Sequence, residues 1–371
     1  MSKTCKILLL GKTGVGKSAL LNYLAGERLA ESGIATSSGG ITRGINRYPI
    51  RINGHDCMVA DSEGLETGDY DTWKKIIDVE LEKTKSSGSV LDWYHIVIFC
   101  ISAGGGRVES SELNIIEQLA REGYGVIIAF TKSDQSSEED TEKLRSEISA
   151  GLPTRKFAYV DVCSVSKRGM DSFGKEDLSE AIVRQWKRTL INRLPEHIYD
   201  WAIDSLKSRK KDIKNWVWEQ DMGFLGRSTE SVSSDVSRKT QAAIESLSSE
   251  MEARYQAAVD DIHAVMTIFD AIFPKFLSST SGLGSVTVVQ GYTSGGDLLM
   301  GGLCIAGTLF AIGIVPVVIP IAILKAVFDD GSKKKKKICE AIDDNFYSIR
   351  KSLLSQKEEF QKKLAESYGE M

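Results

Sequence analysis

The chain has 371 residues, 47 Lys and Arg against 51 Asp and Glu, and 42% hydrophobic residues. This is a globular composition, so wholly disordered and collagen-like chains are excluded, and the length allows two to three domains. Such a mildly acidic chain is a poor general nucleic-acid binder, so we expect no direct nucleic-acid partner. The six cysteines form no CxxC pair, which argues against a disulfide framework or a zinc site. The N-terminal apolar run is too short for a secretory signal, so a cytoplasmic location is expected.

Strand-like and helix-like stretches alternate in the first half of the chain. This predicts an α/β domain with a mainly parallel sheet of about six strands. The expected strands are residues 5–10, 47–53, 55–61, 95–102, 125–131 and 157–163. The expected helices are residues 16–26, 71–86, 109–122, 137–150 and 175–194. The second and third strands are expected to form a hairpin that turns at Asn53-Gly54.

After Pro195 the strand signals stop and helical periodicity begins, which predicts one domain over residues 1–194 and an all-α domain over residues 195–371. The Ser-rich stretch 228–234 is expected to be a loop. One apolar stripe at helical spacing comprises Leu247, Met251, Tyr255, Val259, Ile262, Met266 and Phe269. A second, in an expected helix 338–366, comprises Ile338, Ile342, Phe346, Ile349, Leu353, Phe360 and Leu364. The two stripes are expected to pack together in a helical bundle.

A glycine-rich segment follows the first expected strand and opens the first expected helix. Residues 11–18 read Gly-Lys-Thr-Gly-Val-Gly-Lys-Ser, which matches G-x-x-x-x-G-K-[ST]. The glycines permit a tight loop whose backbone N–H groups bind phosphate oxygens, and the positive end of the helix adds to this attraction. Lys17 is expected to reach the β- and γ-phosphates, and Ser18 is expected to ligate Mg²⁺. The segment therefore predicts a nucleoside triphosphate site.

A second segment, Thr131-Lys132-Ser133-Asp134, follows the apolar strand 125–131, at the sheet edge where bases bind. The Asp134 carboxylate can accept two hydrogen bonds from guanine. Adenine offers neither donor there, so a buried carboxylate would be left unpaired. The stem of Lys132 is expected to cover the face of the base. This segment therefore favours guanine.

Two shorter segments also follow expected strands. Residues 61–64, Asp-Ser-Glu-Gly, form a D-x-x-G sequence. Asp61 is expected to hold Mg²⁺ through water, and the Gly64 N–H is expected to contact the γ-phosphate. Ser164 and Val165 are expected to offer backbone N–H groups to the guanine O6, with an ordinary Ser-rich loop as the alternative.

Taken in order, GKTGVGKS, DSEG, TKSD and CSVSK resemble the motifs of P-loop GTPases of the translation-factor-like class, nearest to the Era-like, septin-like and dynamin-like branches. The resemblance covers residues 1–194 and is strongest to bacterial GTPase domains fused to a membrane-associated helical region. It implies a Mg²⁺-dependent hydrolase that binds GTP and GDP. The implied nucleotide-binding residues are Gly11, Gly14, Val15, Gly16, Lys17, Ser18, Ala19, Thr131, Lys132, Asp134, Ser164 and Val165. The implied catalytic residues are Lys17, Thr42 and Gly64, and the implied Mg²⁺ ligands are Ser18, Thr42 and Asp61.

The threonine that should bind Mg²⁺ and the γ-phosphate in the first mobile loop is either Thr42 or Thr36. Thr42 lies shortly before the next expected strand, and neighbouring glycines suit a mobile loop. Thr42 is therefore the preferred candidate.

The sequence departs from the family pattern after Asp61. Glu63 stands where the family usually has Pro or Ala, and Leu65 stands where Ras-like enzymes place a Gln that orients the attacking water. An apolar side chain cannot orient water, and Gly14 has no side chain to bind potassium or water. Slow basal turnover, stimulated by self-association or by a partner, is therefore expected. Glu66 and Arg107 are candidates to supply the missing group, with a structural ion pair as the alternative for Arg107.

Residues 298–324 carry no charge, and the five lysines Lys333–Lys337 follow. A straight helix of that length would extend about 40 Å, against a bilayer core of about 30 Å, but a glycine and two prolines interrupt it. The favoured interpretation is a hairpin over 298–328 that enters one leaflet, with the lysines on anionic headgroups. A single span is a second interpretation, although it opposes the positive-inside tendency. Burial inside the helical domain or an oligomer is a third.

The sequence thus favours a membrane-associated, dynamin-like GTPase whose nucleotide state changes membrane attachment or self-assembly. The expected location is the cytoplasm, at the cytosolic face of a membrane. The expected partners are a guanine nucleotide, an anionic membrane surface through residues 298–337, and a second copy or a larger assembly. The alternative is a soluble regulatory GTPase that recruits a protein or ribosomal partner, with the apolar segment buried.

Overall fold

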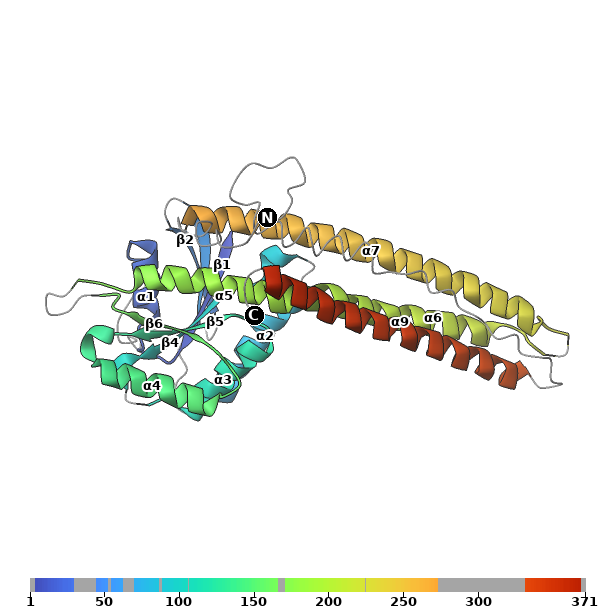
Figure 1. Ribbon diagram of the computed structural model, residues 1–371, viewed down its shortest axis with the longest axis horizontal. Coiled ribbons are helices and arrows are strands. Elements are labelled where there is room, and N and C mark those ends of the chain that lie inside the picture. The colour runs from blue at the N-terminus through green and yellow to red at the C-terminus, as the bar shows by residue number, and fades with distance from the viewer. Residues whose placement is uncertain are drawn as a thin grey trace. The chain divides into compact units, whose positions relative to one another are not determined.

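The computed structural model describes residues 4–29, 45–52, 55–62, 70–86, 89–105, 107–165, 171–223, 225–272 and 331–367. The chain falls into two compact units, whose elements are labelled in Figure 1. The first contains the described residues up to Arg193 and the end of helix α7 from Asp260. The second contains residues from Leu194 to Val259 and helix α9.

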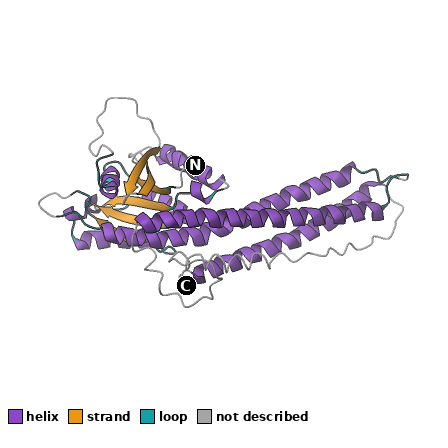
Figure 2. Ribbon diagram, turned by 90° about the horizontal axis from the view of Figure 1, so that it is seen from above, coloured by secondary structure: helices purple, strands orange, loops and turns teal. Residues whose placement is uncertain are grey.

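The first unit is built on a six-stranded sheet in the order β2-β3-β1-β4-β5-β6, drawn in orange in Figure 2. The strands are β1 (Cys5–Gly11), β2 (Ile45–Ile52), β3 (His55–Ser62), β4 (Ile96–Ser102), β5 (Val126–Thr131) and β6 (Ala158–Val162). Among the described strands, only β2 runs antiparallel to its neighbour, and the other pairs are parallel. Strands β1, β4 and β5 are apolar almost throughout because parallel strands covered on both faces must be. The prediction of a mainly parallel six-stranded sheet is confirmed.

Five described helices lie wholly or almost wholly in the same unit: α1 (Lys17–Ala25), α2 (Tyr70–Ser86), α3 (Ser110–Arg121), α4 (Glu138–Gly151) and α5 (Lys175–Pro195). Their ends lie within one residue of the expected helices. Capping boxes start two of them, Glu109 with Glu112 at α3 and Ser137 with Asp140 at α4. Short turns of 3-10 helix occur at η1 (Val90–Asp92), η2 (Ala103–Gly105) and η3 (Ser133–Gln135).

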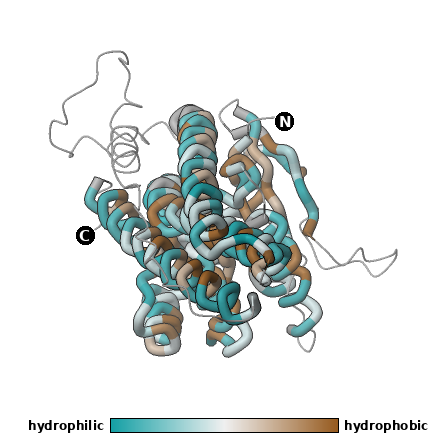
Figure 3. Tube along the Cα trace, turned by 90° about the vertical axis from the view of Figure 1, so that its right-hand side faces the viewer, coloured by the Kyte–Doolittle hydropathy of each residue, from teal (hydrophilic) through white to brown (hydrophobic). Residues whose placement is uncertain are grey.

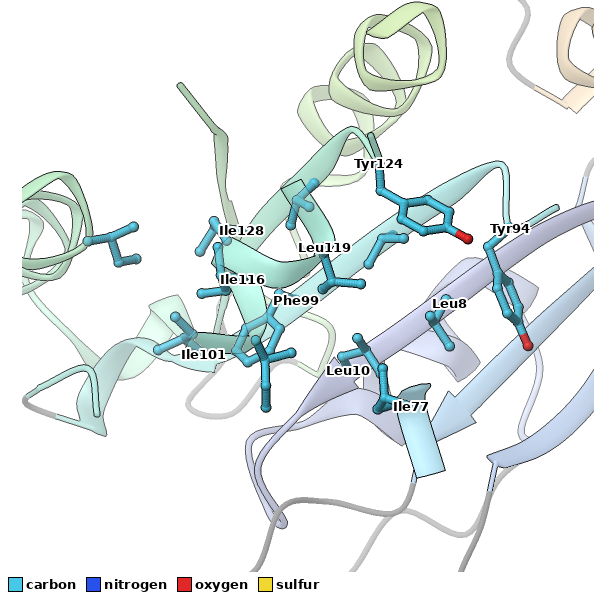
Figure 4. Close-up of a cluster of buried hydrophobic side chains, with 14 of the residues drawn as sticks. Leu8, Leu10, Ile77, Tyr94, Phe99, Ile101, Ile116, Leu119, Tyr124 and Ile128 are labelled. Atoms are coloured by element: carbon cyan, nitrogen blue, oxygen red, sulfur yellow. The ribbon is translucent and has the colours of Figure 1, made fainter. Parts of the chain in front are cut away.

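An apolar core lies between the sheet and helices α2, α3 and α4 (Figure 4). Leu10 and Phe99 from the strands meet Ile77 of α2 and Ile116 of α3 there, all of them buried. Alternate residues of a strand point to opposite faces, so this cluster takes every second residue of β1, β4 and β5. The hydrophobic effect of burying these side chains holds the strand ends in fixed register.

The second unit consists of long helices: α6 (Trp201–Glu219), most of α7 (Thr229–Ile272) and α9 (Gly331–Ser367), with a π-helical turn η4 (Glu196–Asp200) before α6. Hydrophilic and hydrophobic residues are mixed along the helices in Figure 3. All seven expected apolar positions of α9 are buried, which confirms that stripe. The ring of Phe360 contacts those of Tyr199 and Tyr255, and Asp343 of α9 pairs with Lys210 and Lys214 of α6. In α7 the expected positions up to Ile262 are buried, whereas the side chains of Met266 and Phe269 lie outside the described residues.

The expectation of a loop over residues 228–234 is wrong, because α7 begins at Thr229. The hydroxyl of Ser228 accepts a hydrogen bond from the Ser231 N–H at 3.1 Å, as an N-cap does. Arg227 holds Asp235 two turns further on, and Val232 is fully buried. Serine therefore marks the start of a helix here, and the buried valines extend it.

None of the helices among the described residues combines the length and the apolar character needed to cross a bilayer. The uncharged run 298–324 and the hairpin expected over 298–328 lie outside the described residues. The turn expected at Asn53-Gly54 also lies outside them, although β2 and β3 pair as predicted, with Ile52 opposite His55.

A buried carboxylate, Glu80 of α2, ties α2 to β2 and to the segment before β4. It accepts hydrogen bonds from the Tyr94 hydroxyl at 2.5 Å and from the Arg47 guanidinium. Burial alone would raise the pKa of Glu80, but the hydrogen bonds from Tyr94 and Arg47 outweigh it, and the pKa lies below its ordinary value. The ionised form is therefore the one that the fold stabilises.

Replacing Glu80 with Gln is expected to lower the free energy of unfolding at pH 7 by about 1–3 kcal/mol, because a charged acceptor of two hydrogen bonds is lost. The folded pKa lies below the unfolded value of about 4.3, so this contribution is complete above that pH and is lost as the pH falls through the folded pKa. Urea unfolding of wild type and variant should therefore converge in acid. Glu82→Gln, at an exposed position of α2, is the control, and a difference independent of pH would contradict the assignment.

Candidate nucleotide-binding site

The predicted motif residues lie at one edge of the sheet. The register pairs Leu9 with Asp61, Gly11 with Cys100, and Ser102 with Thr131. Parallel strands in this register bring their carboxyl ends together, which is where open α/β sheets bind ligands. The turn after β1, Asp61 at the end of β3 and the segment after β5 are therefore neighbours.

Glycine is required where β1 turns towards α1. Gly11 has φ 138°, and a Cβ built there would lie 2.3 Å from the carbonyl oxygen of Cys100, so no other side chain fits. Gly14 and Gly16 also have positive φ, and Gly16 is the N-cap of α1. The loop therefore presents backbone N–H groups and a helix N-terminus with no side chain in the way.

Lys17, the first residue of α1, is 6% exposed. Its ammonium donates hydrogen bonds to the backbone oxygens of Gly11 at 3.0 Å and Lys12 at 2.8 Å. Burial lowers the pKa of Lys17, and the nearby Asp61 carboxylate opposes that shift. A buried cation held only by carbonyl oxygens is well suited to a phosphate, whose full negative charge binds it more strongly.

Ser18 and Asp61 form an oxygen pair beside this lysine, with Ser18 Oγ 3.2 Å from Asp61 Oδ2. Asp61 is 7% exposed, and its Oδ1 has no hydrogen-bond partner in the part of the chain described. Burial raises the pKa of Asp61, and the charge of Lys17 opposes that shift. An unsatisfied buried carboxylate oxygen next to a hydroxyl fits Mg²⁺, which takes oxygen ligands and fills the rest of its shell with phosphate and water. No cluster of three or more His, Cys, Asp or Glu suited to a metal occurs among the described residues.

The segment after β5 is tied directly to the phosphate loop. Thr131 Oγ1 donates to the backbone oxygen of Val15 and lies 3.2 Å from that of Ile101. Lys132 has φ 58°, and its ammonium donates to the Gly14 carbonyl at 2.6 Å, so its stem crosses the space between the two segments. These bonds fix the distance between the phosphate loop and the base-recognition segment.

Asp134 lies half-buried in the turn η3. Burial and the neighbouring Asp134 carboxylate raise the pKa of the Cys163 thiol, which places near Asp134 a residue that the sequence analysis did not single out. Ser164 is half-buried and Val165 is exposed, directly after Cys163 pairs with Phe173 in an isolated bridge. The segment expected to meet guanine O6 thus stands beside Asp134.

Several predicted residues cannot be placed. Thr42, Thr36, Gly64, Leu65 and the neighbours of Leu65 lie outside the described residues, so their roles stay predictions. Ala19 lies half-buried in α1, and Arg107 is exposed before α3.

The sequence analysis also missed a clamp on the phosphate loop. Lys12 Nζ lies 2.8 Å from Glu109 Oε1 and 3.1 Å from Glu112 Oε2, and Glu112 is 2% exposed. Because Lys12 occupies a variable position of the loop motif, only the E-x-x-E capping signal at 109–112 could have pointed to this pairing. The clamp joins the loop to the start of α3.

Comparison with known proteins gives a family for this region. Residues 6–132 match the model described as "50S ribosome-binding GTPase". GTPase Der of Wolinella succinogenes is 24% identical over 229 residues, 62% of this chain and 45% of that protein. GTPase Der of Borreliella burgdorferi is 30% identical over 175 residues, 46% of this chain and 38% of that protein. The chain therefore spans less than half the length of these relatives.

Among solved structures, Toc33 from Arabidopsis thaliana in complex with Mg²⁺ and GMPPNP is 18% identical. It covers 44% of this chain and 72% of its own, with a TM-score of 0.34. Era in complex with MgGDPNP and a 16S ribosomal RNA segment is 19% identical, with coverage of 50% and 67% and a TM-score of 0.33.

The geometry and the family match agree on the nature of the first unit: it contains a P-loop GTPase domain. Its phosphate loop, its buried Lys17 and its Ser18–Asp61 pair fit GTP or GDP with Mg²⁺.

Replacing Lys17 with Met should remove nucleotide-dependent stabilisation without unfolding the protein. The variant loses a buried cation but keeps an apolar stem, so its nucleotide-free stability should stay within about 1 kcal/mol of wild type. A ligand at about 100 times its Kd adds about 2.7 kcal/mol to stability, so wild type should melt several degrees higher with saturating Mg²⁺–GDP. Lys6→Met, which removes a β1 lysine paired with Asp92, is the matched control and should keep the shift. An equal shift in the Lys17 variant would rule out its contact with phosphate.

Proposed function

We propose that the protein binds and slowly hydrolyses GTP with Mg²⁺, and that a protein or ribosomal partner responds to its nucleotide state. The observation that supports this best is the Ser18–Asp61 oxygen pair with an unsatisfied Asp61 Oδ1. It stands next to a buried lysine whose only described hydrogen-bond acceptors are loop carbonyls. Such a site needs both a phosphate and a hard cation to satisfy it.

In this mechanism Lys17 and the loop N–H groups neutralise charge that develops on the transferred phosphoryl group. Bound Mg²⁺ supplies further charge neutralisation and would be held by Ser18 and Asp61. The Asp134 carboxylate selects guanine, and Lys132 covers the base. Thr42 and Gly64 are the residues expected to respond to the γ-phosphate.

Turnover should be slow because Leu65 cannot orient the attacking water. A Ras-type GTPase that has this Gln but no partner turns over at roughly 10⁻⁴ to 10⁻³ per second, so basal turnover here is expected to be no faster. A partner or a second copy that supplies the group would then set the lifetime of the GTP state, which is the property of a switch.

The comparisons favour a ribosomal or protein partner over the dynamin-like interpretation. The matching family is described as ribosome-binding, and the curated relatives are GTPases named Der. None of these relatives supports dynamin-like self-assembly at a membrane. The family is described as ribosome-binding, and a ribosome contains RNA. This description counts against our expectation that the protein has no direct nucleic-acid partner, and that expectation stays a prediction.

The base-recognition role is tested by Asp134→Asn. An amide can donate a hydrogen bond where the carboxylate only accepts, so the variant should prefer xanthine, which carries a carbonyl in place of the guanine amine. We expect GTP turnover at subsaturating nucleotide to fall by at least about 100-fold and XTP turnover to appear. Asp140→Asn, at an exposed position on α4, should leave both unchanged. Full GTP turnover by the Asp134 variant would refute the assignment.

The partner is tested by sedimentation with 50S ribosomal subunits. The purified protein is loaded with GMPPNP or with GDP. We expect more protein to pellet with the subunits in the GMPPNP state, because the γ-phosphate is expected to order the loops that carry Thr42 and Gly64. Lys17→Met should abolish the difference between the two nucleotides. Equal pelleting with both nucleotides would contradict nucleotide-controlled binding to the ribosome, while leaving GTP hydrolysis to be judged by turnover.

A further inference from the structure

One end of the second unit gathers exposed cations and exposed apolar side chains. Helix α6 ends there at Glu219, the turn that follows leads into α7, and α9 begins at Gly331. The start of α9 packs on this turn, because a Cβ built on Gly331 would lie 2.8 Å from the backbone of Met222. We define the tip surface as Trp218, Leu225 and Lys333–Lys337.

The lysines of the tip surface occupy an unfavourable place in their own helix. They fill the first turns of α9, whose first turn carries no acidic residue. Cations near a helix N-terminus face the positive end of its dipole, and five neighbouring ammonium groups also repel one another. The carboxylates nearest in sequence are Asp329 and Asp330, which lie outside the described residues, and Glu340, and these are fewer than the five lysines. An anionic partner would relieve this repulsion.

Only part of the run has a structural role. Lys335 donates to the backbone oxygen of Trp218 at 2.8 Å, at the C-terminal end of α6, where a cation is favourable. Lys336 and Lys337 are exposed, and neither forms a salt bridge within the described part of the chain. These two ammonium groups are available to a partner.

The apolar members of the tip surface are unusually exposed. Leu225 is 94% exposed in the turn, and Trp218 is 49% exposed beside the Lys335 ammonium, which lies 5.9 Å from its ring. Tryptophan next to lysine is typical of the boundary between lipid headgroups and acyl chains. Moving so exposed a leucine from water into an apolar phase would be favourable, because its apolar surface would be buried.

We propose that the tip surface docks on an anionic lipid bilayer. Lys336 and Lys337 would contact headgroup phosphates, while Leu225 and Trp218 enter the headgroup–acyl boundary. RNA would satisfy the same lysines but would offer Leu225 little apolar surface. The chain outside the described residues also rejoins the structure at Gly331, and its sequence includes the uncharged run 298–324. This inference concerns the second unit alone and does not rest on the proposed GTPase activity.

The test uses the full chain and sedimentation with vesicles of phosphatidylcholine, alone or mixed with phosphatidylserine. Wild type should pellet with the mixed vesicles and much less with phosphatidylcholine. The double variant Lys336→Gln, Lys337→Gln should lower the partition coefficient at least about tenfold, since each lysine near an anionic surface contributes about 1 kcal/mol. The matched control, Arg350→Gln with Lys351→Gln, makes the same charge change at exposed positions roughly 20 Å further along α9 and should bind as wild type.

The apolar contribution is tested by Leu225→Ser at raised salt, where the lysine attraction is screened. Partitioning should fall about tenfold, because a leucine side chain is no longer buried in lipid. Leu354→Ser removes another partly exposed leucine of this unit, from α9, and is the control.

Four results would overturn the proposal. The first is wild type that does not pellet with anionic vesicles. The second is equal loss in both double variants, which would indicate a general charge effect. The third is undiminished binding by the Lys336 and Lys337 variant, which would assign binding to other residues. The fourth is lysine-dependent binding to RNA without vesicle binding, which would make the tip an RNA surface. GTP turnover in the same samples reports on the first unit, so failure of one proposal is distinguishable from failure of the other.

Discussion

The candidate site depends on one close approach of backbone to backbone. Gly11 of β1 lies so near the Cys100 carbonyl of β4 that no side chain can separate them. This contact fixes where β1 ends and therefore where the phosphate loop begins. The parallel register then sets Asp61 on one side of that point and Thr131 on the other side of β4. A shift of one residue would turn each of these side chains to the opposite face of the sheet.

The second constraint is electrostatic. Lys17 and Asp61 are both buried, and burial acts against the charged form of each. Their mutual attraction and the bonds from Lys17 to Gly11 and Lys12 offset part of that cost, but Asp61 Oδ1 is left unsatisfied. A nucleotide with Mg²⁺ would satisfy both groups: Lys17 would hold phosphate, and Asp61 with Ser18 would hold the cation, directly or through water. The site is thus organised before its ligand arrives, which reduces the reorganisation that binding must pay for.

The sequence predicts those features of the fold and the site that depend on residues close together in the chain. The strands are apolar runs, the helices carry caps, and the phosphate loop is a contiguous motif, so the sheet and the positions of Lys17, Ser18 and Asp134 could be predicted. The Lys12 clamp could not, because it joins residues about a hundred positions apart through side chains that no periodicity links. The Ser-rich stretch misled for a different reason: serine favours both loops and helix N-caps, and only the burial of Val232 decides between them.

The two units offer anions two different kinds of surface. In the first unit, phosphate would meet backbone N–H groups and one buried lysine, so geometry and a low dielectric environment make the attraction selective and hard to screen. In the second unit, Lys336 and Lys337 stand in water on long flexible stems, so their attraction is sensitive to salt and indifferent to the chemical identity of the anion. Selectivity at such a surface has to come from neighbouring apolar groups. Here the exposed Leu225 and Trp218 are the neighbouring apolar groups, and they would favour a lipid surface over other anions for the lysine run.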